Sequence, residues 1–181
     1  GVIADVSRSY RVAIRTTAEA FGAVVEAGSI EAIKADGDAN DDWALTRLLI
    51  ERNGIDVDLD AVTEEFQRRY LGGADRAGLR EQESLLFDPA CLRRLRDRMP
   101  IGLVTGRPRD EAIWFLDRYE LTALFDVVVA REDAPLKPSP RGIRSAMETL
   151  RAGRAWFIGD TVDDVMAAKA AGLVPIGVSV D

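Results

Sequence analysis

The chain has 181 residues, of which 47% are apolar and 30% are charged, so it can bury a core and still present a well-solvated surface. Its net charge of −7 argues against a general nucleic-acid binder, because a phosphate backbone requires a basic face. No apolar run is long enough to span a membrane, the first residues show no leader pattern, and the single cysteine, Cys91, excludes an internal disulfide. We therefore expect a cytoplasmic protein that binds neither membranes nor nucleic acids.

The first part of the chain, to about residue 86, has the apolar spacing of helices. One helix is predicted within residues 6–25, a second within 41–53 and a third within 60–70. An Asn-Gly pair and a Gly-Gly pair follow the second and third helices, where glycine favours helix termination. No strand is predicted between residues 7 and 86.

The second part changes to short β-branched runs that alternate with helices. Four runs are expected to form strands: Ile101–Thr105, Phe125–Ala130, Ala155–Ile158 and Val174–Val178. Helices are predicted between them, over 108–119, 140–150 and 163–171. This alternation is typical of an α/β protein with a doubly wound parallel sheet, which binds ligands at the carboxyl ends of its strands.

Thr105-Gly106-Arg107-Pro108 follows the first of these runs. A hydroxyl and glycine N–H groups beside a helix start are suited to cradle a phosphate. The alternative is that Thr105 only caps the turn, as a threonine at the end of a strand often does.

Lys137-Pro138-Ser139-Pro140 follows the second run. The two prolines stiffen the backbone around one of only three lysines, and a fixed ammonium can neutralise a phosphoryl group and an attacking carboxylate together. The chain has no histidine, so acid–base chemistry falls to carboxylates or lysine. The alternative is a solvated loop lysine ahead of a helix.

Three carboxylates follow the third run, at Asp160, Asp163 and Asp164. Placed this close together they repel one another unless a cation lies among them, and oxygen ligands favour magnesium over zinc or copper. The alternative for Asp163 and Asp164 is that they complement the dipole of the following helix.

Taken in order, Val-Thr-Gly-Arg at 104–107, Lys-Pro-Ser-Pro at 137–140 and the segment from Ile158 to Gly172 resemble motifs two, three and four of the haloacid dehalogenase (HAD) superfamily. Gly1-Val2-Ile3-Ala4-Asp5 resembles the tail of motif one, Asp-x-Asp-Gly-x-x-x-Asp. The resemblance implies a core domain formed by residues 1–6 and 87–181 and a small α-helical cap formed by residues 7–86, as in the phosphoglycolate-phosphatase-like branch of subfamily I.

The resemblance further implies a magnesium-dependent phosphatase that hydrolyses a small phosphate monoester through an aspartyl-phosphate. Thr105 and the backbone of Gly106 would bind the phosphoryl oxygens, with Arg107 beside them. Lys137 would steady the nucleophile and the transferred group. The metal ligands would be Asp160, Asp164 and Asp163.

The family's nucleophilic and acid–base aspartates would lie just upstream of Gly1. We expect the natural polypeptide to continue there by about one strand, roughly 5–10 residues, ending in Asp-x-Asp.

Within the expected cap, the polar turn that precedes the second helix carries Asn40, Asp42 and Trp43. By resemblance this turn closes over the substrate and excludes water, which makes the three residues candidate substrate contacts. The alternative is a solvated turn with Trp43 in the core of the cap.

Three other functions fit the same motifs. A phosphomutase would use the same residues, a haloacid dehalogenase would need no metal and is disfavoured by the acidic cluster, and an inactive relative would keep the fold without motif one. Neither the substrate nor the oligomeric state is predicted.

Overall fold

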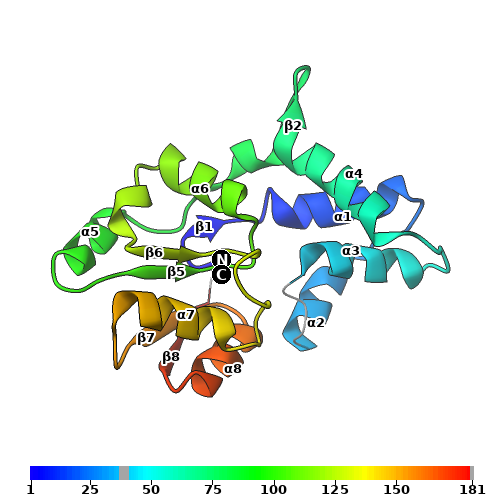
Figure 1. Cartoon of the computed structure of the whole chain (residues 1–181). Helices are drawn as coiled ribbons and strands as arrows, with labels where there is room; N and C mark the ends of the chain where they lie inside the picture. Colours follow the sequence, from blue (N-terminus) through cyan, green and yellow to red (C-terminus); the bar gives the residue numbers. More distant parts are fainter. Residues whose placement is uncertain (37–40, 180–181) are drawn as a thin grey trace. The chain divides into compact units, whose positions relative to one another are not determined.

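The computed structural model describes residues 1–36 and 41–179, which fall into two compact units (Figure 1). We call the first, Gly1 with Ile3–Leu86, the helical unit, and the second, Val2 with the residues from Phe87 onward, the α/β unit. In the described ranges, no helix is both long and apolar enough to cross a membrane.

Four helices build the helical unit: α1 (Tyr10–Ala20), α2 (Ser29–Asp36), α3 (Asp42–Glu51) and α4 (Leu59–Leu71). The Asp41 side chain caps α3 by accepting hydrogen bonds from the N–H groups of Trp43 and Ala44 at 3.1 and 3.2 Å. Helix α4 ends where Gly72 takes a positive φ of 77°, a conformation that glycine adopts without strain. The second and third predicted helices are therefore confirmed, whereas α2 was not predicted.

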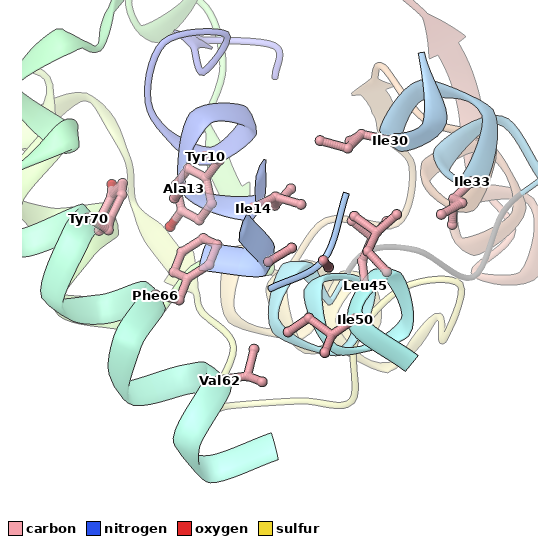
Figure 2. Packing of buried hydrophobic residues seen from close by; sticks show 13 residues of the cluster. Tyr10, Ala13, Ile14, Ile30, Ile33, Leu45, Ile50, Val62, Phe66 and Tyr70 are labelled. Atoms are coloured by element: carbon pink, nitrogen blue, oxygen red, sulfur yellow. The ribbon is translucent and has the colours of Figure 1, made fainter. Parts of the chain in front are cut away.

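The core of the helical unit lies between α1, α3 and α4, and Ile30 and Ile33 of α2 belong to the same buried cluster (Figure 2). Val62, Phe66 and Tyr70 recur at helical spacing on one face of α4, and all three are fully buried. The Tyr10 ring of α1 packs on Tyr70, with 4.6 Å between the ring centroids. Each large buried side chain of this kind stabilises the fold by about 1.5–3 kcal/mol relative to an exposed one.

Short strands close the helical unit. Strand β1 (Ala4–Asp5) pairs antiparallel with β4 (Ser84–Leu85), and β2 (Gly72–Gly73) pairs with β3 (Arg76–Ala77) ahead of the 3₁₀ helix η1 (Leu79–Gln82). The prediction that residues 7–86 contain no strand was therefore wrong. The β1–β4 pair places the two ends of the helical unit side by side, as an insertion requires. The identity of the helical unit as a cap stays a prediction.

The α/β unit contains the parallel strands of the fold. Its elements are α5 (Ala90–Arg96), β5 (Gly102–Val104), α6 (Arg109–Arg118), η2 (Thr122–Leu124), β6 (Val127–Val129), α7 (Arg141–Leu150), β7 (Trp156–Gly159), α8 (Val162–Ala170) and β8 (Val174–Gly177). Each of the four predicted strands and three predicted helices is present, with ends shifted by one or two residues. The α/β class predicted from the alternating pattern is confirmed.

The strands of the α/β unit form two parallel pairs, β5–β6 and β7–β8. Within residues 1–36 and 41–179 no ladder joins one pair to the other. An apolar cluster connects them instead: Ile143 of α7 and Ala167 and Ala168 of α8 pack together with Val104 of β5 and Phe157 of β7. The carboxyl ends of β5, β6 and β7 carry the turns of the candidate site.

One face of the β7–β8 pair is apolar and open. Trp156 lies opposite Val174, and Ile158 lies opposite Ile176. These four side chains are 41–64% exposed, whereas Phe157, on the other face of β7, packs against α8.

Candidate active site

Thr105 begins the turn between β5 and α6. Its N–H donates to the carbonyl oxygen of Val129 at 2.9 Å, which continues the β5–β6 pairing, and its Oγ1 accepts from the N–H of Arg107 at 3.2 Å. The hydroxyl therefore caps the turn, and its own hydrogen is not used in that bond. Both interpretations of Thr105, cap and donor to an anion, are compatible with this geometry. The Arg107 guanidinium lies over the Phe115 ring, 5.4 Å from its centroid.

Lys137 lies in the loop between β6 and α7, with a cis peptide bond to Pro138. Its Nζ is 2.6 Å from Oδ1 of Asp164 and 5.8 Å from the centroid of the Phe157 ring. The lysine side chain is only 13% exposed, so the interpretation of Lys137 as a solvated loop residue does not hold. The same loop lines a small hollow together with Thr105 and Gly106.

Asp164, which forms the ion pair with Lys137, has its carboxylate buried at the start of α8. Oδ2 accepts from the N–H groups of Asp160 and Thr161, both at 3.1 Å, while the Asp164 N–H donates to Thr161 Oγ1 at 3.1 Å. This reciprocal arrangement is a capping box. Burial acts to raise the pKa of Asp164, but the Lys137 ammonium and the hydrogen bonds from Lys137 and Thr161 outweigh it and hold the pKa below its usual value.

Gly159 leaves the space that this carboxylate occupies. A Cβ atom at Gly159 would lie 2.2 Å from Cβ and 2.6 Å from Cγ of Asp164, closer than real contacts allow. A glycine at the end of β7 is thus needed for the Asp164 side chain to fold back over the turn.

Asp160 is exposed at the carboxyl end of β7, and Asp163 is buried on the first turn of α8. Because Asp164 faces Lys137, the three carboxylates do not gather around one point, and the described part of the chain holds no group of three side chains placed as metal ligands. Magnesium is commonly held by one or two carboxylates together with waters and substrate phosphates. Asp160 fits that requirement in chemistry and position.

The candidate contacts in the helical unit have structural partners of their own. Asp42 is ion-paired with Lys34, with 2.7 Å between Nζ and Oδ1. Trp43 is half-buried and packs against the core of the helical unit, which favours the structural alternative for this residue. Asn40 lies outside the described residues.

Three charged residues beside these turns were not singled out in the sequence. Glu132 and Asp133 follow β6, and both accept hydrogen bonds from Arg109 at the start of α6. Two acidic residues shortly after a strand run are a weak signal, because such residues are common in solvated loops.

Comparison with known proteins identifies the family of the chain. The sequence model of the haloacid dehalogenase-like hydrolase family matches residues 1–172. A protein of Phytophthora nicotianae named imidazoleglycerol-phosphate dehydratase is 44% identical over 98% of this chain and 41% of its own length. The phosphoglycolate phosphatase of Yersinia pestis is 33% identical over 55% of this chain and 45% of its own length.

Among solved structures, a phosphatase from Thermococcus thioreducens superposes with a TM-score of 0.79 at 24% identity, covering all of this chain and 90% of that one. At this identity the likeness shows the fold alone. The chain spans less than half the length of the two curated relatives above. The family match covers nearly the whole sequence, including all three motif-bearing turns, so the chain belongs to the haloacid dehalogenase-like hydrolase family.

Proposed function

We propose that the protein is a magnesium-dependent phosphatase that hydrolyses a small phosphate monoester through an aspartyl-phosphate. The observation that carries the proposal is the buried Lys137–Asp164 ion pair, which lies in the α/β unit beside the Thr105–Gly106 turn. A lysine held in this way supplies a fixed positive charge at the carboxyl ends of the strands, where such folds bind ligands.

The chain's own residues would bind and neutralise the phosphoryl group. Thr105 donates its hydroxyl hydrogen and Gly106 its backbone N–H to phosphoryl oxygens, and Lys137 faces the charge that develops as the phosphorus–oxygen bond breaks. Phosphoryl transfer needs mainly positioning and charge neutralisation, which these groups provide without a general base of their own.

Asp160 would hold the magnesium ion, with Asp163 and Asp164 contributing through the surrounding structure or through water. When bound, the ion neutralises phosphoryl charge and orients the ester for in-line attack. Asp164 supports this arrangement indirectly, because it fixes the backbone at Asp160 through the hydrogen bond from the Asp160 N–H.

The attacking group would be the first aspartate of the family's motif one, and the second aspartate of that motif would protonate the leaving oxygen and then activate water. The paired ends of the helical unit, β1 and β4, support its role as an inserted cap over a core of this family. In that role, side chains around Asp42 would influence which substrate is accepted.

The names of the relatives suggest the first compounds to test, since both refer to small phosphate monoesters. Release of inorganic phosphate by the full-length protein is measured with phosphoglycolate, imidazoleglycerol phosphate and a panel of sugar phosphates. We expect release that requires Mg²⁺ and falls sharply in Lys137→Met. Isomerised sugar phosphate without free phosphate would identify a phosphomutase instead, and turnover that persists in excess chelator would contradict the magnesium role.

A further inference from the structure

The loop that carries Lys137 is tied to the turn that carries Thr105 by charged side chains outside the candidate site. The carboxylate of Glu132 accepts the Arg109 N–H with both oxygens, at 3.3 and 3.1 Å. Arg109 is the first residue of α6, directly after the Thr105–Pro108 turn. Glu132 therefore satisfies an N–H at the start of α6 from the neighbouring loop.

Asp133 makes the second tie. Its Oδ2 accepts from the Arg109 guanidinium and from the N–H of Ala130 at 2.7 Å, so one carboxylate oxygen joins the side chain of α6 to the end of β6. Arg109 Nη2 also donates to the carbonyl oxygen of Val128 at 3.2 Å. The Arg131 N–H donates to the carbonyl oxygen of Arg107 at 3.0 Å. This bond links the two segments beyond the end of the β5–β6 ladder.

We propose that Arg109, Glu132 and Asp133 form a loop clamp, a set of positioning residues that fixes the separation of the Thr105 turn and the Lys137 loop. The inference rests on the proposed function, in which both segments act on one phosphoryl group. Because β5 and β6 pair over only three residues, the clamp adds constraint where the ladder ends.

The clamp is expected to influence catalysis more than stability. Arg109 and Asp133 have side chains that are 44% and 36% exposed, and exposed ion pairs contribute only about 0–1 kcal/mol to folding. A displacement of about 1 Å between groups that act on one transition state, by contrast, can reduce the rate on the order of 100-fold.

The test compares Glu132→Gln and Asp133→Asn with Asp110→Asn, a matched neutralisation at an exposed position in the first turn of α6. In full-length protein with its best phosphate ester, we expect kcat to fall about 10-fold or more in the two clamp variants, with a smaller change in KM. Asp133→Glu should recover part of the loss. Melting temperatures of all variants should stay within about 2–4 °C of the wild type, the equivalent of 1 kcal/mol.

A second measurement does not depend on activity. Amide NMR spectra of both clamp variants should show shifts or broadening at Thr105, Gly106 and Lys137, and Asp133→Asn should also show faster hydrogen exchange at Ala130, whose N–H donates to Asp133. All of these changes should be absent in Asp110→Asn. Clamp variants that match Asp110→Asn in spectrum overturn the clamp whether or not the protein is a phosphatase. A protein that releases no phosphate yet shows these spectral changes refutes the proposed function and leaves the clamp standing.

Discussion

Replacing Lys137 with methionine removes the ammonium that lies 2.6 Å from the Asp164 carboxylate but keeps most of the side-chain volume. Asp164 is only 5% exposed, so water cannot take over the role of the ammonium. Breaking a buried ion pair by removing one partner typically costs about 3–5 kcal/mol. The two N–H donors from Asp160 and Thr161 remain, so we expect the lower end of this range, about 3 kcal/mol, equivalent to a melting temperature lower by roughly 6–12 °C.

The loss should depend on pH, with a sign set by Asp164. In the wild type the pKa of this group lies below its usual value, so the group contributes stability above its unfolded pKa, and the contribution is lost as the pH falls through the folded pKa. Without Lys137, the effect of burial, which raises the pKa of Asp164, is opposed by fewer interactions. The pKa of Asp164 therefore rises relative to the wild type. The stability gap between wild type and Lys137→Met should therefore be widest near neutral pH and narrow on acidification.

Urea denaturation at pH 7.5 and at about pH 3.5, below the usual pKa of an aspartate, measures this gap. Lys169→Met, at an exposed position of α8, is the matched control and should change stability by less than about 0.5 kcal/mol. The double variant Lys137→Met with Asp164→Asn removes both charges and should be more stable than Lys137→Met alone. The reasoning fails if Lys137→Met costs no more than Lys169→Met, or if its cost is the same at both pH values.

Three other substitutions test separate features. Tyr70→Phe removes one of the hydroxyl donors to the buried carboxylate of Glu83, at 3.1 Å, and should cost about 1.5–3 kcal/mol in urea denaturation; an unchanged midpoint would contradict the role of this bond. Gly159→Ala places a Cβ against the side chain of Asp164. It should lower the free energy of unfolding by about 1–3 kcal/mol and also reduce phosphate release. Unchanged stability and activity would show that the Asp164 carboxylate can move without consequence. Asp160→Asn should lower phosphate release on the order of 100-fold or more at nearly unchanged melting temperature, and a variant of wild-type activity would remove Asp160 from the proposed metal site.

The sequence predicted the elements that have strong local signals. Helix α3 begins after Asp41 and α4 ends at Gly72, because a carboxylate cap and a glycine in the left-handed region determine those boundaries locally. Helix α2 was missed because its only large apolar residues are Ile30 and Ile33, too few to establish a period. The β2–β3 hairpin was missed because its residues are largely exposed and carry no alternating apolar pattern.

At the site, the residue types could be predicted but their partners could not. The motifs after the strand runs predicted Lys137 and Asp164 as candidate site residues, yet the ion pair between them depends on the packing of the Lys137 loop against the start of α8. The loop clamp could not be predicted for the same reason. Glu132 contacts Arg109 only because the fold places the segment after β6 beside the start of α6. Trp43 shows the opposite case, because a candidate substrate contact proved to pack against a core.

The open face of the β7–β8 pair has a consequence for how the molecule behaves in solution. Cross-strand pairs of Trp156 with Val174 and Ile158 with Ile176 place four large, partly exposed apolar side chains on one face of a short sheet. An exposed apolar surface of this kind favours self-association. At neutral pH the net charge of −7 opposes it, because negatively charged molecules repel one another. The repulsion disappears near the isoelectric point of about 4.8 and is screened by salt at higher pH. Light scattering should therefore rise near pH 4.8 or in concentrated salt, and replacing Trp156 with a charged residue should suppress it.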